Sequence, residues 1–231
     1  MFYKKMLKNR DKSQLVFRLD ISLPIKLTED QDSLTELAFQ LCGDVKDYVS
    51  AIAIDSPFFI AVGPVNAEKI IRKFKVPFIA DFNLAETEPA SLWIAEHAFN
   101  AGFDALVVHS FMGRDYVQKL KEFSGSNEII PILGMSHDSS RDFINPSSDR
   151  MCDIVKYLKM KTAIVPSDVK QVSRMRECLG DVLLFADSES GSIGDYVRAG
   201  ADFEMVGRSI HNSKDPEETA LRLMNDLRNS K

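Results

Sequence analysis

The sequence has few of the residues that would mark a metal-binding, disulfide-rich or membrane-spanning protein. Only three cysteines occur among its 231 residues, Cys42, Cys152 and Cys178, with neither a metal-ligand spacing nor the even number of a disulfide framework. No segment approaches the roughly 20 apolar residues of a membrane-spanning helix. The N-terminus is basic but lacks the apolar run of a signal peptide, so we expect a cytoplasmic protein with reduced thiols.

Positive charge is also scarce, since 29 lysines and arginines stand against 34 aspartates and glutamates, a formal net charge of -5. Proteins that bind nucleic acid need a basic surface to neutralise phosphates, so this balance argues against a general nucleic-acid binder. It leaves room for a local basic pocket that holds a single phosphate. The apolar fraction of 45% is that of an ordinary globular protein.

Short apolar runs alternate regularly with helical patterns along the chain. The runs predict eight strands, near residues 15–19, 49–54, 76–81, 103–108, 129–134, 162–166, 182–186 and 203–206. Helical periodicity lies between them, at 29–42, 66–74, 89–101, 114–123, 147–160, 168–179 and 215–229. This alternation indicates parallel strands joined by crossover helices, and eight such units close into a (β/α)8 TIM barrel. We predict one barrel domain over residues 13–231, preceded by a basic arm or helix over residues 1–12.

An open, doubly wound α/β sheet is the alternative architecture. That fold usually carries a Gly-x-Gly-x-x-Gly turn after its first strand. The first predicted strand is followed here by residues 20–24, which read Asp-Ile-Ser-Leu-Pro and contain no glycine. The barrel is therefore the preferred prediction.

Functional residues of a barrel lie at the carboxyl ends of its strands. The residues predicted there are Asp20, Asp55, Ser56, Asp81, Asn83, Glu86, His109, Ser110, Ser136, His137, Pro166, Ser167, Asp187, Ser188, Gly207 and Arg208. Acidic side chains follow the first three strands, and a cation follows the last. This polarity suits a ligand with a phosphate at one end and reactive chemistry at the other.

The segment Gly207-Arg208-Ser209-Ile210 is the best phosphate-binding candidate. Glycine lets backbone amides approach an oxyanion, and a guanidinium can bind phosphate through two hydrogen bonds. Residues 191–194, Gly-Ser-Ile-Gly, would add amide donors upstream. A plain turn from strand to helix is the alternative interpretation of both segments.

The histidines and the single tryptophan are predicted to have structural roles. His109 and His137 end predicted strands, where a structural hydrogen bond is commoner than catalysis. His211 follows the last strand and is expected to cap a turn. The single tryptophan, Trp93, is predicted to pack in the core.

Several of these blocks, in this order, resemble the orotidine 5′-monophosphate decarboxylase family, and its short archaeal members most of all. The segment from Phe78 to Glu86 resembles the family signature Asp-x-Lys-x-x-Asp, which reads here Asp-x-Asn-x-x-Glu. The other matching blocks are residues 19–20, 101–109, 135–137, 165–167 and 206–210. The resemblance extends from Leu15 to about Leu227. It implies a TIM barrel, pyrimidine biosynthesis, a small-molecule phosphate ligand, a homodimer and no cofactor.

The family's reaction uses an alternating array of two lysines and two aspartates. Position by position, the resemblance assigns catalytic places to Asp20, Asp81, Asn83 and Glu86, and substrate-binding places to Ser136, Pro166, Gly207 and Arg208. Glu86 lies where the family lends an aspartate to the neighbouring subunit. Both lysines are replaced, by Ala53 on the second strand and by Asn83 on the third. Loss of a single transition-state donor typically lowers a rate by about 10²–10³, so this chain is predicted to decarboxylate poorly.

Three functions remain open from the sequence. The first is a carbon–carbon lyase of the orotidine 5′-phosphate decarboxylase type. The second is a metal-dependent sugar-phosphate lyase of the same suprafamily, with Mg²⁺ on Asp20, Asp55, Asp81 and Glu86. The third is a non-catalytic protein that binds a nucleotide or another phosphate. Under the first and third interpretations no metal or cofactor is expected.

Overall fold

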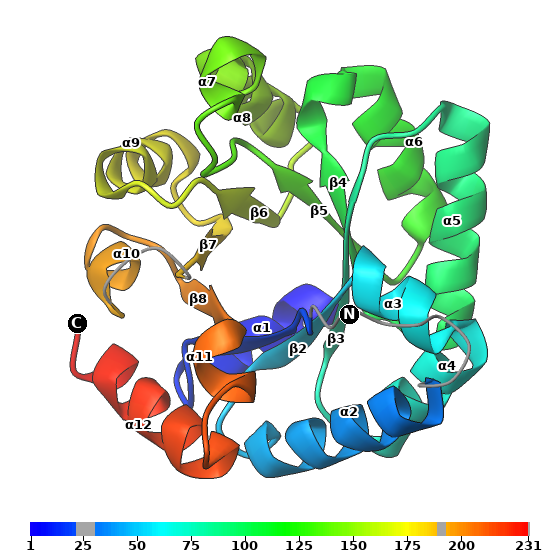
Figure 1. The fold of residues 1–231 in the computed structure, drawn as a ribbon. Helices are drawn as coiled ribbons and strands as arrows, with labels where there is room; N and C mark the ends of the chain where they lie inside the picture. Colours follow the sequence, from blue (N-terminus) through cyan, green and yellow to red (C-terminus); the bar gives the residue numbers. More distant parts are fainter. Residues whose placement is uncertain (22–30, 189–192, 231) are drawn as a thin grey trace.

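Eight parallel strands form a closed barrel in the computed structural model, which describes residues 1–21, 31–188 and 193–230 (Figure 1). The strands are β1 (Leu15–Leu19), β2 (Ala51–Asp55), β3 (Phe78–Leu84), β4 (Ala105–His109), β5 (Glu128–Ile132), β6 (Thr162–Val165), β7 (Leu183–Asp187) and β8 (Phe203–Val206). Each strand pairs with the next, and β8 pairs with β1. The predicted barrel is confirmed, and the doubly wound alternative is wrong.

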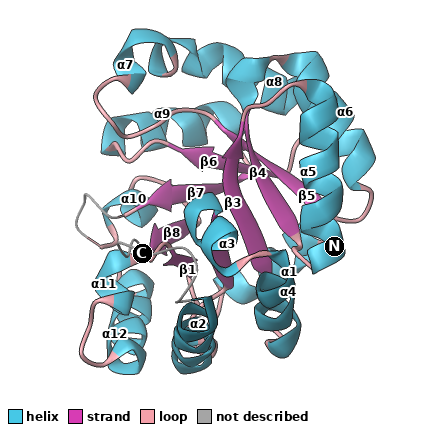
Figure 2. Ribbon diagram, turned by 45° about the vertical axis from the view of Figure 1, so that its right-hand side comes forward, coloured by secondary structure: helices cyan, strands magenta, loops and turns pink. Residues whose placement is uncertain are grey.

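Helices surround the barrel (Figure 2). The longer ones are α1 (Phe2–Arg10), α2 (Gln31–Val45), α4 (Pro64–Lys73), α5 (Glu88–Ala101), α6 (Arg114–Ser124), α8 (Ser148–Tyr157), α9 (Val169–Leu179) and α12 (Pro216–Arg228). The periodicity predicted seven of these to within a few residues. It missed the shorter helices α3 (Ser56–Val62), η1 (Ser110–Met112), α7 (Ser140–Phe143), η2 (Asn145–Ser147), α10 (Asp195–Arg198) and α11 (Arg208–His211). A helix of one or two turns has too few residues for a detectable apolar period.

Two apolar layers stabilise the barrel, because alternate residues of each strand face inward and outward. Inside, small residues such as Ala51, Ala53 and Ala105 lie with the large rings of Phe185 and Phe203. The second layer fills the space between the strands and the helices and contains most of the remaining buried side chains. The inner layer is therefore uneven, with little side-chain volume on β2 and much on β7 and β8.

Helix α1 adds two apolar side chains to the inner layer. Phe2 and Met6 are fully buried there, and the Phe2 ring stacks on Phe185 with centroids 6.5 Å apart. Tyr3 and Leu7 pack against the same cluster, so these four residues form the face of α1 that packs against the barrel.

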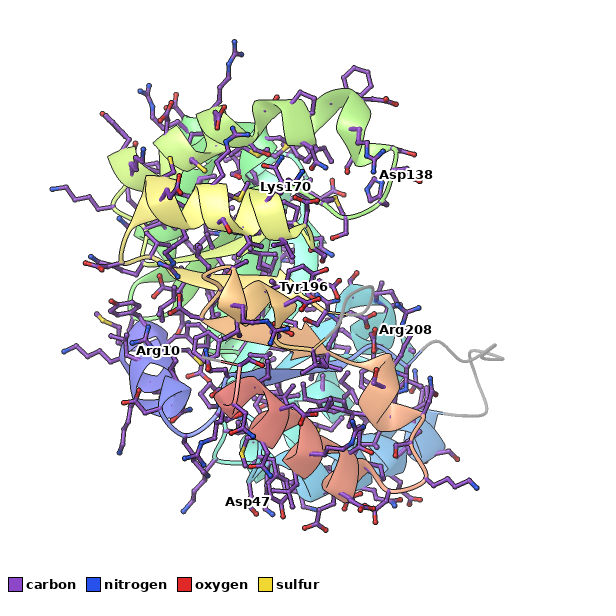
Figure 3. The ribbon with its side chains drawn as sticks, turned by 90° about the vertical axis from the view of Figure 1, so that its left-hand side faces the viewer. Arg10, Asp47, Asp138, Lys170, Tyr196 and Arg208 are labelled. Atoms are coloured by element: carbon purple, nitrogen blue, oxygen red, sulfur yellow. The ribbon has the colours of Figure 1, made fainter. Side chains whose placement is uncertain are left out.

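The polar contacts of α1 show which end of the barrel it covers. Lys5 Nζ lies 2.7 Å from Asp104 Oδ1, Arg10 Nη1 lies 2.6 Å from Asp202 Oδ1, and Asn9 donates to the Ser50 carbonyl at 3.0 Å. All three partners directly precede strands, so α1 closes the amino end. Figure 3 shows Arg10 and Arg208 at opposite ends of the molecule.

The prediction that Trp93 packs in the core is wrong, because 62% of its surface is exposed. Helix α5 instead buries the small residues Ala95, Ala98 and Ala101, which allows it to lie close to the barrel. The three cysteines lie in α2, α8 and α9 as predicted and are free thiols. No helix in the described part of the chain is long and apolar enough to cross a membrane.

Candidate active site

A cavity of about 360 Å³ opens at the carboxyl ends of the strands. It is lined by Arg18, Asp20, Asp55, Asp81, Asn83, Ile132, Gly134, Met135, Ser136, His137, Ile164, Val165 and Asp187. Small-ligand pockets commonly measure roughly 300–1,000 Å³. A larger groove of about 600 Å³ lies at the opposite end, beside α1 and the start of β3, and holds none of the predicted site residues.

The cavity brings together about half of the residues that the sequence assigned to the site. Asp20, Asp81, Asn83 and Ser136 line it, together with Asp55, His137 and Asp187 from the wider set of strand-end residues. Glu86, Pro166, Gly207 and Arg208 do not line it. Glu86 and Arg208 are exposed, whereas Pro166 is buried with its ring under Gly134. His109 is also buried outside the cavity, and this burial lowers the pKa of its imidazole.

Arg18 is the central cation of the cavity, and sequence reasoning missed it. Its Nε lies 2.9 Å from Asp81 Oδ2, and its Nη1 donates to Asp187 Oδ2 at 2.8 Å. The guanidinium thus bridges carboxylates from β3 and β7 across the mouth of the barrel. The available signal was a charged residue inside a predicted buried strand, two positions before Asp20 and therefore on the same face.

Ala53 provides the space that Arg18 occupies. The two residues are register partners on β1 and β2, and Ala53 belongs to the inner apolar layer. A long side chain at position 53 would compete with the arginine for this volume. The neighbouring strand therefore places a cation beside position 53, with Nη1 donating to Asp187 and Nε close to Asp81.

Burial dominates the electrostatics of this ion pair. Burial by itself lowers the pKa of the Arg18 guanidinium, but Asp81 and Asp187 more than offset this, so that its pKa is raised and it stays charged. Burial raises the pKa of Asp81, and the negative charges of Asp187 and Asp20 act in the same direction, while Arg18 opposes them. Arg18 is thus the group that favours the ionised form of Asp81 against burial and the neighbouring carboxylates.

Asp55 has a structural contact and an unusual acidity. Its Oδ1 accepts the Phe58 amide at 2.8 Å and so caps helix α3. Burial, together with the charges of Asp20 and Asp81, raises the pKa of Asp55 to about 6, although the Phe58 amide opposes the shift. Asp55 therefore gains and loses a proton close to physiological pH.

Asn83, which the resemblance assigns to the family's catalytic lysine position, has a left-handed backbone conformation with φ of 47°. Asparagine tolerates this region better than most residues. The register between β3 and β4 shifts between Ala80 and Leu84, so the strand is irregular at this place. The amide side chain lines the cavity but cannot serve as an acid near neutral pH.

The loops after β5 and β6 form the opposite wall. Asn145 fixes the β5 loop, because its side chain both accepts from the Met135 amide and donates to the Met135 carbonyl, at 2.9 Å each. Ser136 donates to the Ser167 hydroxyl at 2.7 Å and accepts from the Ser167 amide at 3.0 Å. The two loops are thus joined by the serine that the family resemblance assigns to the substrate.

The predicted phosphate-binding segment lies next to Asp20. A Cβ on Gly207 would be 2.2 Å from Asp20 Oδ1, so only glycine fits beneath this carboxylate. The same oxygen is 2.9 Å from Nε2 of His211, which pairs with Asp20 and does more than cap a turn. Arg208 begins α11 at the rim of this face (Figure 3). Gly191 and Ser192, proposed as part of an upstream amide site, lie outside the described residues.

Glu204 on β8 holds the residues on both sides of the loop that follows β7. Its fully buried carboxylate accepts the Ser188 hydroxyl at 2.5 Å and the amides of Gly194, Tyr196 and Val197 at 3.0–3.1 Å. Ser188 is therefore a structural residue that points away from the cavity. Within the described ranges, no group of His, Cys, Asp and Glu side chains is arranged to hold a metal ion.

Removing the charge of Arg18 is expected to destabilise the fold strongly, because Asp81 is only 4% exposed and would be left without its cation. Arg18→Met should lower the free energy of unfolding by about 3–5 kcal/mol, measured by urea denaturation at pH 7.5. Arg18→Met combined with Asp81→Asn should cost clearly less than Arg18→Met alone. Arg114→Met, at an exposed ion pair with Asp115, is the matched control and should change little. Equal stability of wild type and Arg18→Met would contradict the assigned role.

Comparison with known proteins agrees with this geometry. Residues 28–223 match the model of the orotidine 5′-phosphate decarboxylase / HUMPS family. The orotidine 5′-phosphate decarboxylase of Pyrococcus furiosus is 33% identical over 198 residues, which cover 84% of this chain and 92% of that protein. The crystal structure of the Pyrococcus horikoshii enzyme aligns with a TM-score of 0.81 and 31% identity, over 93% of this chain and 99% of that one. The Methanocaldococcus jannaschii enzyme complexed with inhibitor BMP aligns with a TM-score of 0.82 over 93% and 98% of the two chains, but at 24% identity it shows the fold alone. The chain therefore belongs to the orotidine 5′-phosphate decarboxylase / HUMPS family.

Proposed function

We propose that this family member binds a pyrimidine nucleoside 5′-phosphate in the 360 Å³ cavity and lacks efficient lysine-dependent decarboxylation. The observation that carries the proposal is the Arg18 bridge between Asp81 and Asp187, beside Ala53 and close to Asn83. A guanidinium held by two carboxylates and charged at every physiological pH cannot give a proton to a carbanion. Asn83 cannot do so either.

The proposed ligand pose follows the polarity of the cavity. The base lies between Ser136 and the carboxylates of β1 to β3, all of which line the same cavity. The phosphate lies toward the start of α11, where the Gly207 backbone and the Arg208 guanidinium would contact it. Asp20, directly above Gly207, then separates the phosphate end from the base end and is available to a ribose hydroxyl.

The metal-dependent sugar-phosphate lyase gains no support from the site. Glu86 is exposed and does not line the cavity with Asp20, Asp55 and Asp81. A protein that binds a nucleotide and catalyses no reaction on it would also agree with the proposed function. A cytoplasmic location stays a prediction of the sequence.

Binding of uridine 5′-monophosphate tests the cavity and its phosphate end. Thermal-shift titration should show stabilisation by uridine 5′-monophosphate and a much smaller effect of uridine, which lacks the phosphate. Arg208→Gln should weaken binding of the nucleotide by at least about tenfold and leave that of uridine unchanged. Arg222→Gln, an exposed change on α12, is the matched control. Absence of any shift with the nucleotide would refute the proposed ligand.

Turnover of orotidine 5′-monophosphate tests the chemical half of the proposal. At high protein concentration, the loss of substrate absorbance should be at least about 10²–10³ slower than with a family enzyme that has the Asp-x-Lys-x-x-Asp signature. The uridine 5′-monophosphate titration shows that the same preparation has a working site. A rate equal to that of the lysine-containing enzyme would mean that this site has another proton donor.

We also propose a homodimer formed through the side of the barrel that carries α3, α4 and α5. These helices pack in succession, and each exposes a large apolar side chain near the carboxyl end of the barrel: Ile60 is 70%, Val65 is 66% and Trp93 is 62% exposed. Glu86 lies in the loop directly before α5, outside its own cavity. This placement supports the family arrangement in which that position serves the neighbouring subunit.

Sedimentation velocity tests the dimer. The wild-type chain should sediment as a dimer at micromolar concentration, and Trp93→Glu should shift it to a monomer because a charge would be buried in the interface. Phe143→Glu, at an even more exposed aromatic on α7, should leave the dimer intact. A monomeric wild-type chain would contradict the proposal.

A further inference from the structure

The base end of the cavity has a large excess of hydrogen-bond acceptors. Four carboxylates line it, from Asp20, Asp55, Asp81 and Asp187, and Arg18 is the single Lys or Arg side chain among its described lining residues. Two of the four carboxylates contact Arg18. The formal charge of the lining is therefore -3 when His137 is neutral.

The contacts of these groups leave acceptor capacity toward the cavity. Asp55 accepts the Phe58 amide through Oδ1, and Asp20 pairs with His211 through Oδ1. An ionised carboxylate accepts about four hydrogen bonds, so each of these contacts uses a fraction of the capacity. Arg18, by contrast, donates from Nη1 to Asp187, has Nε 2.9 Å from Asp81 Oδ2 and places Nη2 3.9 Å from the Met205 sulfur.

A ligand carboxylate is poorly suited to this lining. It would bring a fifth negative charge into a partly buried group of four, and it would have to compete with Asp81 and Asp187 for the one guanidinium. Burial is the main cause of the raised pKa values of Asp55 and Asp81, and the charges of the neighbouring carboxylates act in the same direction. A group that donates hydrogen bonds would relieve the repulsion between these carboxylates.

We infer that the site selects a 4-aminopyrimidine nucleoside 5′-phosphate, of the cytidine type, over the 4-oxo and carboxylated pyrimidines. The inference rests on the proposed function, because it requires that the cavity binds a pyrimidine nucleotide. The exocyclic amine of cytosine is a donor that aspartate and glutamate accept, whereas uracil presents a carbonyl oxygen at the same place. Asp55 is the chosen acceptor, because its side chain is anchored by the α3 cap and lines the cavity.

Isothermal titration calorimetry at pH 7.5 with the whole chain tests this inference. Cytidine 5′-monophosphate should bind about tenfold tighter than uridine 5′-monophosphate, and orotidine 5′-monophosphate should bind more weakly than either. Asp55→Asn retains a good cap for α3 but removes the charge, so it should reduce the cytidine preference to about threefold or less. Asp115→Asn, at an exposed aspartate on α6, should leave the preference unchanged.

The pH dependence gives a second readout. Lowering the pH from 7.5 to 5 protonates Asp55, which faces Asp20, Asp81 and Arg18, and should weaken cytidine 5′-monophosphate binding in the wild type. Asp55→Asn should reduce this pH dependence, and the part that remains belongs to the phosphate of the ligand, whose second pKa is about 6. Equal affinity for all three nucleotides, or tightest binding of orotidine 5′-monophosphate, would overturn the inference and leave the proposed function standing. If no nucleotide binds, the proposed function itself fails.

Discussion

The Arg18 bridge to Asp81 and Asp187 is the interaction on which the site depends. It ties β1 to β3 and β7 across the open end of the barrel, with distances of 2.9 and 2.8 Å. Such a buried pair adds little net stability compared with apolar packing, but it restricts the geometry of every neighbouring carboxylate. The bridge supplies the positive charge of the cavity lining, opposes the effect of burial on Asp81 and fills the space beside Ala53. The result is a site with one arginine among four carboxylates.

The fold was predictable because its signals are periodic and repeated. Eight apolar runs with helices between them leave few topologies, and Asp20, Asp81 and Asn83 line the cavity because strand ends meet at one face. Arg18 was missed because a single charged residue within an apolar run forms no repeating pattern that could be recognised in the sequence. Its partners also lie 63 and 169 residues further along the chain. Pro166 and Trp93 were misplaced because loop paths and helix rotation depend on packing that the local sequence does not contain.

The two ends of the barrel have different chemistry for a physical reason. At the amino end, α1 supplies the apolar volume that the alanines of β2 and β4 lack, so that end is closed and packed. At the carboxyl end, no comparable plug occurs among the described residues, and the inward positions carry charge. The apolar core and the charged lining of the cavity are therefore separate parts of the same barrel.

The position of α1 also governs when the chain can complete its interior during synthesis. Phe2 and Met6 are synthesised long before the rings that receive them, Phe185 and Phe203, and Arg10 long before its partner Asp202. Helix α1 must therefore wait, with two large apolar side chains uncovered, until β7 and β8 have been made. Contacts of such long sequence separation slow folding and leave the nascent chain open to misassembly. Final closure of the barrel and docking of its N-terminus thus become a single late event.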